Sequence, residues 1–506
     1  MVVDVQDRLS RLRIHLRDAC HSSLPATVPC SELRRNLVGL RVLACAFVLA
    51  TSSACQSNPQ DFSGPRFLPD TRATAAARVP SGAEKILYSF QNGSDGAFPR
   101  ASLIVDKAGN LYGTADNAGG AGDCSIHCGT VFELAPPATK GTRWKFTTLY
   151  AFTGGKDGGL PTGNVIFGPD GSLFGTTDVG GVDLKHNGRG VVFHLVFSGG
   201  RWKETVLHRF GRGIDGAYPH GGLVFDKLGN LYGTTALGGP GQCLGGCGNV
   251  YALSPPTRPG RQWTETILHS FAGGTDGEWP QAGLAIDRTG RLYGTTEFGG
   301  FYSEFCGAGC GTAFELTPSA SGTAARYAVI HRFQPGNAGD GALPLDPLTL
   351  DAKGNLLGTA LEGLPHNPGY AGMAFELERS AGAKTWTEHV LYNFPQYPND
   401  AAYPHAGLVF DGSGNLYGTS EVGGTSQNVG TAFKLIPPSG SKHTWTDVVL
   451  YAFSRAHHGA IYPQTNLIFG AGGLLYGTTP QGGSGSSQAC VMIKNKGCGT
   501  IFDVTP

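Results

Sequence analysis

A short motif recurs seven times along the chain at a nearly constant interval. In each copy an apolar pair precedes a glycine–threonine step, whose threonines are Thr114, Thr176, Thr234, Thr295, Thr359, Thr419 and Thr478. The glycines of successive copies lie 58 to 64 residues apart. A constant period over most of a chain indicates one supersecondary unit that is repeated until it stacks or closes. The repeat therefore constrains the architecture more than it constrains the function.

Each period contains four segments with the character of β-strands. In the third repeat they are residues 222–226, 231–235, 248–253 and 263–271. Each is short, rich in β-branched or aromatic residues and bounded by turn-forming residues, which is typical of strands. Four antiparallel strands per unit, repeated seven times, predict an all-β fold, a seven-bladed β-propeller. A solenoid would need shorter repeats, and the helical period of 3.6 residues is absent.

The phase of the repeat predicts how the ring closes. If the strand at 222–226 and its equivalents are innermost in their blades, the strands that contain the recurring tryptophan are outermost. The last repeat ends at 499–504 without an outermost strand, whereas residues 85–90 match the outermost segment 205–210. We therefore expect residues 85–90 to complete the last blade, which removes two open sheet edges.

The composition agrees with a protein made of strands and tight turns. Charged residues make up 15% of the chain, and 79 of the 506 residues are glycine. So much glycine without a collagen period suits many tight turns. Lysine plus arginine equals aspartate plus glutamate at 38 each, so no basic field exists to attract nucleic acid.

The region before the repeats has the layout of an export signal followed by a tether. Arg34, Arg35 and Arg41 precede an apolar run at 42–50 and then small residues that end at Cys55. A positive flank, a short apolar core and small residues are typical of a secretory signal. The run is shorter than the ~20 residues that span a bilayer. We expect an N-terminal extension and export signal at 1–54, a disordered tether at 55–83 and the propeller at 84–506.

Cys55 is the candidate attachment point for lipid. Ser53-Ala54-Cys55 resembles the lipobox of bacterial lipoproteins, although Ser52 stands where Leu or Val is usual. Residues 42–45 fit that box better but leave almost no apolar core before them, and simple cleavage after Ala54 is the alternative to lipidation. Because signals normally begin at the N-terminus, residues 1–32 are interpreted as an over-extended gene start. The prediction is an outer-membrane or cell-surface lipoprotein, or a periplasmic or extracellular protein, that meets a membrane only through its N-terminal anchor.

The cysteines of the repeats fall in pairs within one class of loop. The pairs are Cys124/Cys128, Cys243/Cys247, Cys306/Cys310 and Cys490/Cys498. In an exported chain such pairs predict four local disulfides. A zinc or redox site is the alternative, but no histidine recurs beside the pairs and they belong to separate blades. One aspartate per loop is also too few oxygens for calcium, so we expect no metal and no cofactor.

Antiparallel strand order predicts which loops share a face. One class of loops connects an outermost strand to the innermost strand of the next blade, and another connects a second strand to a third. Both classes should lie on the same face. The first class carries an Asp-Gly turn and then a proline, as at Asp215, and this elaborated face is expected to carry function. His208, His269 and His331 take the position that tyrosine holds in four other blades, so we interpret them as structural.

A ring of side chains beside the loop prolines is the candidate binding site. Before the prolines stand Phe98, Leu160, Tyr218, Trp279, Leu343, Tyr403 and Tyr462, and after them stand Arg100, Thr162, His220, Gln281, Leu345, His405 and Gln464. Large apolar groups beside polar groups suit sugars or extended peptides. The alternative is that the apolar members pack one blade against the next. The ligand-binding candidates are Phe98, Arg100, Tyr218, His220, Trp279, Gln281, Tyr403, His405, Tyr462 and Gln464.

The whole repeat resembles a known family. Its Leu-Tyr-Gly-Thr-Thr, Gly-Gly and Gly-Thr-Val-Phe-Glu-Leu elements, the last at 129–134, resemble the GloVer (Gloeo/Verruco) tandem repeat of bacterial "choice-of-anchor" surface proteins. The resemblance covers residues 84–506, with mild departures at Leu357 and Ala401. It implies export, a surface anchor that varies between members and a propeller. It supplies no activity and no catalytic residue.

Two classes of function follow from these observations. The first is a monomeric binding or interaction module that engages a glycan or a protein at the channel mouth. The second is a propeller hydrolase or lyase acting on an extracellular polymer, and a purely structural surface protein is also open. Propeller hydrolases and lyases confine their acid, base or metal-binding residues to one or two blades. The asymmetric ionisable residues of the ring and its loops, Arg100, His220, His405 and His458, include no convincing nucleophile–base pair, so binding is the prediction and catalytic residues stay unknown.

Overall fold

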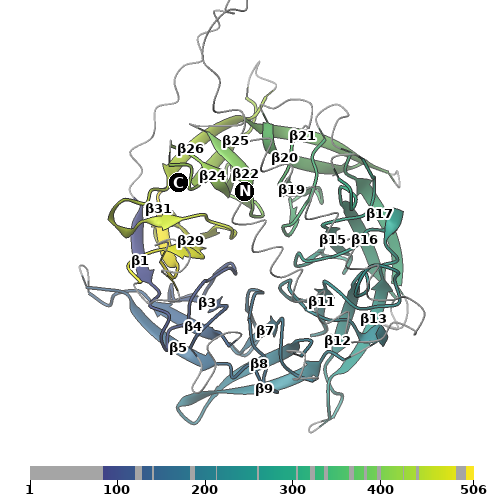
Figure 1. The fold of residues 1–506 in the computed structure, drawn as a ribbon, viewed down its shortest axis with the longest axis horizontal. Coiled ribbons are helices and arrows are strands. Elements are labelled where there is room, and N and C mark those ends of the chain that lie inside the picture. The colour runs from purple at the N-terminus through teal and green to yellow at the C-terminus, as the bar shows by residue number, and fades with distance from the viewer. Residues whose placement is uncertain are drawn as a thin grey trace, which may run out of the picture. The chain divides into compact units, whose positions relative to one another are not determined.

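Short strand-forming segments separated by tight turns produce seven antiparallel sheets, which stand in a ring as the blades of a propeller (Figure 1). The computed structural model describes residues 84–119, 128–139, 142–182, 188–211, 213–258, 261–303, 306–319, 325–334, 340–363, 370–380, 385–395, 400–425, 427–439, 444–485, 490 and 497–506. The expected export signal, tether and Cys55 lie outside these residues. The described part of the chain contains no helix with the length and hydropathy of a membrane span.

Each of the seven blades contains four strands, which in blades 1 to 6 follow one another along the chain from the innermost to the outermost. Blade 1 consists of β2 (Ile104–Val105), β3 (Leu111–Ala115), β4 (Thr130–Ala135) and β5 (Lys145–Ala151), and blade 2 of β6 (Ile166–Phe167), β7 (Leu173–Thr177), β8 (Val191–Ser198) and β9 (Arg201–Arg209). Blade 3 consists of β10 (Val224–Phe225), β11 (Leu231–Thr235), β12 (Asn249–Ser254) and β13 (Thr264–Ser270), and blade 4 of β14 (Ala285–Ile286), β15 (Leu292–Thr296), β16 (Thr312–Pro318) and β17 (Ala325–Arg332). Blade 5 consists of β18 (Thr349–Leu350), β19 (Leu356–Ala360), β20 (Tyr370–Arg379) and β21 (Trp386–Pro395).

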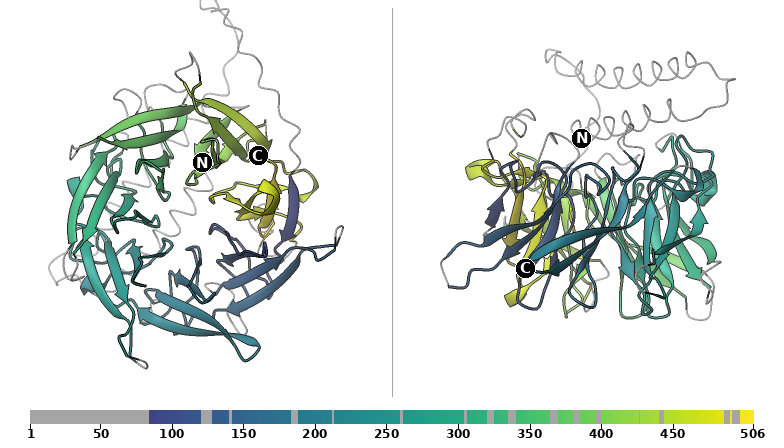
Figure 2. Two further views of the ribbon diagram at one scale, coloured as in Figure 1. Left: turned by 180° about the vertical axis from the view of Figure 1, so that it is seen from behind. Right: turned by 90° about the horizontal axis from the view of Figure 1, so that it is seen from below.

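The last two blades complete the ring. Blade 6 consists of β23 (Val409–Phe410), β24 (Leu416–Gly423), β25 (Thr431–Ile436) and β26 (Thr446–Ala452), and blade 7 of β28 (Ile468–Phe469), β29 (Leu475–Thr479), β31 (Thr500–Val504) and β1 (Lys85–Ser89). The loops also contain β22 (Ala401–Pro404), β27 (Ala460–Ile461) and β30 (Gln481–Gly482), and the single turns η3 (Gly213–Asp215), η4 (Gly274–Asp276), η5 (Ala456–His458) and η6 (Ala471–Gly473). Figure 2 shows the same ring from behind and from its edge. The predicted fold class and blade count are confirmed.

The recurring glycine–threonine step holds neighbouring blades together. The glycine makes room for an aromatic side chain of the third strand, since a Cβ at Gly113 would lie 2.7 Å from the Phe132 ring. The threonine hydroxyl donates to a backbone carbonyl of the next blade at 2.9 to 3.3 Å in all seven copies, as from Thr176 to Gly221. The motif that defines the repeat is therefore structural.

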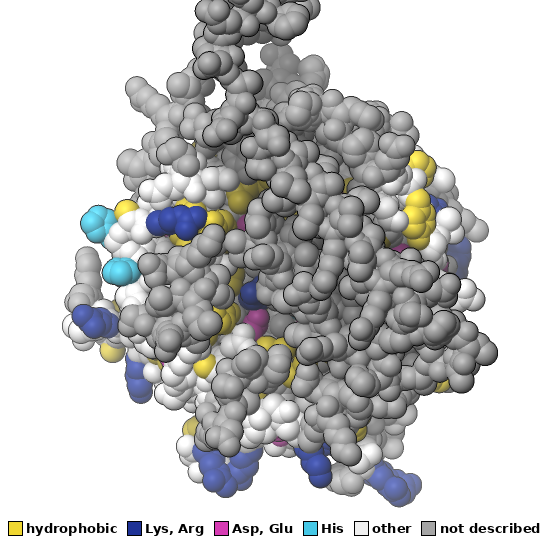
Figure 3. All heavy atoms as spheres, viewed as in Figure 1, with side chains coloured by type: hydrophobic (Ala, Val, Ile, Leu, Met, Phe, Trp, Pro, Cys, Tyr) yellow, Lys and Arg dark blue, Asp and Glu magenta, His cyan; other side chains and the backbone are white. Residues whose placement is uncertain are grey.

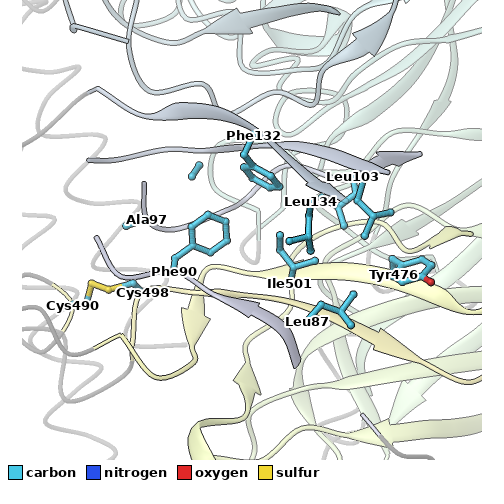
Figure 4. Packing of buried hydrophobic residues seen from close by; sticks show 12 residues of the cluster. Leu87, Phe90, Ala97, Leu103, Phe132, Leu134, Tyr476, Cys490, Cys498 and Ile501 are labelled. Atoms are coloured by element: carbon cyan, nitrogen blue, oxygen red, sulfur yellow. A yellow bond between two sulfur atoms is a disulfide. The ribbon is translucent and has the colours of Figure 1, made fainter. Parts of the chain in front are cut away.

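The strand at the start of the propeller sequence closes the ring as predicted. β1 pairs antiparallel with β31, so Lys85 lies opposite Asp503. Leu87 and Phe90 pack with Ile501 of blade 7 and Phe132 of blade 1 in one buried cluster (Figure 4). The last blade is thus built from both ends of the propeller sequence, and no blade is left with an unpaired third strand.

Candidate functional site

The two expected loop classes do share one face of the ring, which we call the loop face. Short β-bridges join each loop after an outermost strand to the segment after a second strand. The paired residues are Ala97 and Asn117, Gly159 and Val179, Ala217 and Leu237, Glu278 and Phe298, and Ala342 and Glu362. In blades 6 and 7 the pairing lengthens into β22 with β24 and β27 with β30. On the opposite face the turns from the first to the second strand are tight, as at residues 106–110, whereas the connections from the third to the fourth strand are nine residues long in blades 1, 3 and 6.

The residues before the loop prolines share a left-handed backbone in all seven blades, although none is glycine. They are Phe98, Leu160, Tyr218, Trp279, Leu343, Tyr403 and Tyr462, with φ between 51° and 60°. Such a conformation costs a bulky residue on the order of 1–3 kcal/mol, and glycine would adopt it freely. A large side chain in this conformation in every blade indicates that the side chain is used, in packing, in binding or in both.

Five of these residues, Phe98, Leu160, Tyr218, Trp279 and Leu343, bridge two blades through their backbones. The N–H of Leu160 donates to the carbonyl of Cys128 in blade 1 at 2.8 Å, and its own carbonyl accepts from Asp178 in blade 2 at 2.9 Å. Trp279 makes the same pair of bonds with Cys247 and Glu297, at 3.0 and 3.1 Å. The left-handed turn therefore aligns the loop with both neighbours and fixes where its side chain emerges.

The loop prolines pack against glycines of the preceding blade. A Cβ on Gly129 would lie 2.3 Å from Cδ of Pro161, and one on Gly499 would lie 2.4 Å from Cδ of Pro99. Because these glycines also have positive φ values, no other residue fits the close approach without strain. The contact between Pro99 and Gly499 joins blade 1 to blade 7 on the loop face.

The predicted disulfides hold the loops that carry the acceptor carbonyls. Cys243 bonds to Cys247, Cys306 to Cys310 and Cys490 to Cys498. Cys128 is also disulfide-bonded, whereas Cys124, its expected partner, lies outside the described residues. The second cysteine of a pair accepts the N–H of the left-handed residue in the next blade, as Cys498 does from Phe98 at 2.8 Å. The cross-links therefore stiffen the rim of the candidate site.

Five of the seven apolar members of the ring pack into two groups between the blades, whereas Phe98 and Leu343 pack against other clusters. Leu160, Tyr218 and Trp279 share one cluster across blades 2 to 4, and Tyr403 and Tyr462 share another. Tyr218 is 3% exposed, so its ring is packed and not presented to solvent. The others are half-buried, and the Trp279 ring meets Phe298 edge-on, with 5.4 Å between centroids. Packing and partial exposure are combined in the same residues.

The polar members of the ring are held by carboxylates. Arg100 Nε lies 3.1 Å from Asp116 Oδ2, and the Gln281 amide donates to Glu297. His405 Nδ1 lies 3.9 Å from Asp346 Oδ1 in the preceding blade. Leu345 and Gln464 are half-buried at the equivalent position in blades 5 and 7. The short contacts of Arg100 and Gln281 with carboxylates orient these two side chains more firmly than neutral hydrogen bonds do.

The best-defined of these groups joins blades 2 and 3. Nδ1 of His220 lies 2.8 Å from Asp178 Oδ2, and the Thr162 hydroxyl donates to Asp178 Oδ1 at 2.8 Å. A carboxylate at Nδ1 fixes the proton on that nitrogen, so Nε2 carries the lone pair. Among the described residues, Nε2 of His220 makes no hydrogen bond. Its chemical capacity is to accept a hydrogen bond or a proton from a ligand.

The acids beside the polar ring residues, which we call the supporting acids, were not predicted from the sequence. Asp116, Asp178 and Glu297 follow the second strand directly, the equivalent Glu421 lies within β24, and all four are at most 9% exposed. The signal was an acid two residues after the repeated threonine in four of the seven copies. Asp346, which contacts His405, lies near the start of blade 5 and had no such signal.

The histidines interpreted as structural do pair with the turn aspartates. Nε2 of His208 lies 3.0 Å from Asp215 Oδ1, and Nε2 of His269 lies 3.1 Å from Asp276 Oδ2. Tyr88 and Tyr150 donate to Asp95 and Asp157 in the same way. The aspartates also accept backbone N–H groups of their own turns, as Asp95 does from Gly93 at 2.9 Å.

Exposed apolar side chains gather on one sector of the loop face. Val182, Ile214, Leu244, Phe301 and Tyr302 lie in loops of blades 2 to 4 and are 36% to 68% exposed. Near the centre of the face in Figure 3 a basic side chain lies beside an acidic one, among apolar side chains. The loops with these exposed residues belong to the same blades as the Leu160–Tyr218–Trp279 cluster, and we call them the exposed sector.

Fold and site together define a disulfide-stabilised seven-bladed β-propeller with one elaborated face. The chain belongs to the Gloeobacter/Verrucomicrobia repeat family, whose model matches residues 76–304 and, overlapping them, 185–386. This confirms the resemblance seen in the repeat. A search of curated proteins found no match.

Several solved structures are similar to the chain at low identity. A protein of unknown function from Dyadobacter fermentans is 13% identical, with a TM-score of 0.36, 72% of this chain covered and 96% of that one. A luciferin-regenerating enzyme is 13% identical, with a TM-score of 0.33 and 67% and 88% covered. PorZ, a surface component of the type-IX secretion system of Porphyromonas gingivalis, is 13% identical, with a TM-score of 0.35 and 76% and 49% covered. Likenesses this distant carry no functional argument.

Proposed function

We propose that this protein is an exported, surface-anchored binding module that engages a glycan or a protein segment on the loop face of its propeller. The observation that carries the proposal is a difference between constant and variable positions of the repeat. Glycine, threonine and proline form the same inter-blade frame in each blade. The residue after the proline varies, with five residue types in the seven blades, and in blades 1, 3, 4 and 6 it is a polar side chain next to a buried or half-buried acid.

This arrangement suits the recognition of a ligand better than a purely structural role. Because backbone bonds, glycines, threonines and prolines form the frame, the side chain after each proline can vary without loss of the frame. Specific sites combine apolar surface with a few polar groups of fixed orientation. Arg100, His220, Gln281 and His405, together with the partly exposed ring of Trp279, provide both.

The export part of the proposal rests on two features. Residues 34–55 have the layout of a secretory signal that ends in a candidate lipid-attachment cysteine. Disulfides persist in oxidising compartments and are rare in the cytosol, and three complete disulfides lie in the described loops. Both features favour a protein that works outside the cytoplasm.

A hydrolase or lyase is the second candidate, and one observation favours it. The Asp178–His220 pair is confined to blades 2 and 3, and its geometry leaves a histidine nitrogen able to act as a general base. However, the neighbouring Thr162 hydroxyl bonds to Asp178 and lies 3.3 Å from Nδ1, the protonated nitrogen. It is therefore not placed to be activated as a nucleophile, and binding is the better-supported function.

The deciding experiment is a screen of the purified protein on glycan and peptide arrays. A glycan ligand should lose affinity on His220→Ala and Gln281→Ala, since polar groups dominate its recognition. A protein ligand should be more sensitive to Ile214→Ser and Phe301→Ser in the exposed sector. Phe197→Ser serves as the control, because Phe197 is 61% exposed at the turn between β8 and β9 on the opposite face. Cleavage of an arrayed polymer that stops in His220→Ala would favour the enzyme.

A further inference from the structure

The outer rim of the propeller contains a repeated side-chain cluster at the seams between blades. At six of the seven seams an aspartate of the loop pairs with a side chain of the outermost strand before it, and the outermost strand after it places a further side chain at the seam. Between blades 2 and 3 these residues are His208 on β9, Asp215 in the loop and Glu265 on β13. Between blades 4 and 5 they are His331, Asp340 and Glu388.

The two clusters have closely similar geometry. His208 Nε2 lies 3.0 Å from Asp215 Oδ1 and 3.6 Å from Glu265 Oε1. His331 Nε2 lies 3.3 Å from Asp340 Oδ2 and 3.8 Å from Glu388 Oε1. In each cluster one atom of every side chain lies within 4.8 Å of the other two. The side chains keep 10% to 21% of their surface exposed, so solvent reaches the clusters.

Each cluster contains more acceptors than the surrounding chain can satisfy. Oε1 of Glu265 and Oε1 of Glu388 are buried, and neither accepts a hydrogen bond from a donor among the described residues. A buried acceptor without a partner is costly. Two carboxyl groups beside one another require a positive charge, which either a shared proton or a metal ion can supply.

The other seams supply an internal comparison. Two of them hold two acids but have tyrosine in place of histidine, as Tyr392 does beside Asp400, where Asp447 lies. The seam of His269 and Asp276 has Tyr327 in place of the second acid, with its ring stacked on the imidazole at 3.6 Å. Cys243, Cys247 and Glu278 also lie together, but the cysteines are disulfide-bonded and offer no thiolate.

We propose that the His208–Asp215–Glu265 and His331–Asp340–Glu388 clusters are two binding sites for a divalent transition-metal ion such as Zn²⁺. One imidazole nitrogen and two carboxylate oxygens are a ligand set that Zn²⁺ accepts, with water in the fourth position. Tetrahedral Zn²⁺ with bonds near 2.0 Å separates its ligand atoms by about 3.3 Å, which lies within the range of the imidazole–carboxylate distances above. Each ion would link two blades at the rim. These sites go beyond the proposed function and replace the expectation of no metal.

The test is metal stoichiometry with Zn²⁺ as the probe. The purified protein is stripped with a chelator, dialysed against micromolar Zn²⁺ and measured by mass spectrometry of the metal, with the melting temperature as a second readout. We expect two ions per chain and a higher melting temperature with Zn²⁺. His208→Tyr and His331→Tyr should each remove one ion, and the double variant should remove both and the stabilisation.

The tyrosine variants are chosen because they should fold. Four other seams have tyrosine at this position, and in three of them its hydroxyl bonds to the loop aspartate, as at Asp95, Asp157 and Asp400. His269→Tyr is the matched control and should leave the count at two. Tyr392→His should raise it to three, since Asp400 and Asp447 are already in place. A wild-type protein that binds no Zn²⁺, or two ions retained in the folded double variant, would overturn the proposal, and the paired acids would then share protons.

Discussion

The hydroxyl of Thr478 donates to the carbonyl of Ala101 at 3.1 Å, across 377 residues of sequence. This bond is one of seven equivalent threonine bonds, and it is the one that joins the last blade to the first. The other six connect blades that follow one another in the chain. The ring is thus closed by the same interaction that repeats within it, and also by the pairing of β1 with β31.

Thr478→Val should weaken the closing seam. The substitution leaves the carbonyl of Ala101 without its donor in a buried position, which should lower the free energy of unfolding by about 1–2 kcal/mol. Thr478→Ser keeps the hydroxyl and is the control. Urea denaturation of the two variants measures the difference, and equal stabilities would show that the hydroxyl does not contribute.

Loss of the N-terminal strand should be more severe. Deletion of residues 85–90 exposes the edge of β31, and an open edge promotes pairing between molecules. Leu87→Asp should act in the same direction, since Leu87 is 9% exposed within the closing core, whereas Lys85→Ala, at an exposed position, should not. Light scattering and melting temperature are the measurements. A monomeric deletion variant with unchanged melting temperature would contradict the closure.

Glu204 should make the stability depend on pH. Burial, and then the negative charge of Asp157, raises the pKa of Glu204 to about 7, and Arg209 offsets part of this. The folded chain therefore holds a proton that the unfolded chain releases above its ordinary pKa of 4.5. The contribution of Glu204 to the free energy of unfolding therefore falls as the pH rises from about 4.5 through about 7.

Glu204→Gln removes this dependence because glutamine does not ionise. The variant should gain about 1 kcal/mol over the wild type at pH 8 and little at pH 4, a magnitude reduced for solvent screening of a partly exposed group. Tyr150, which also faces Asp157, is unchanged in the variant. Denaturation curves at the two pH values measure the effect, and parallel pH profiles would rule it out.

Trp279→Ala should weaken ligand binding roughly thirtyfold, because an aromatic anchor contributes about 2 kcal/mol or more. The fold should survive, since the backbone bonds of this residue to Cys247 and Glu297 remain. Circular dichroism accompanies the binding measurement. Unfolding of the variant, with no ligand found for the wild type, would assign Trp279 to blade packing alone.

Cys55→Ser should release the protein from membranes if Cys55 is lipidated. The wild type should then sediment with the membrane fraction of its host, and the variant should appear in the soluble exported fraction. Soluble wild-type protein in the periplasm or medium would end the lipoprotein proposal and favour simple cleavage after Ala54.

The fold was predictable because the same structural residues recur in every repeat. The glycine–threonine step, its period and the unmatched outermost strand at 85–90 were enough to predict seven blades and their closure. The supporting acids were harder to predict, because Asp178 meets His220 only when two blades stand side by side. The left-handed backbone of residues such as Trp279 was not predictable, since neither the residue type nor the following proline favours it. The rim clusters combine three elements from two blades, and only an alignment of the outermost strands would have placed Glu265 near His208.

The pairing of β1 with β31 also has a consequence for how the chain is made. β1 is the first strand of the propeller to leave the ribosome, and its partner β31 is the last. The ring therefore cannot close before β31 has been synthesised. Contacts this distant in sequence slow folding. During synthesis the growing chain therefore keeps an open seam until the residues of β31, up to Val504, have been added.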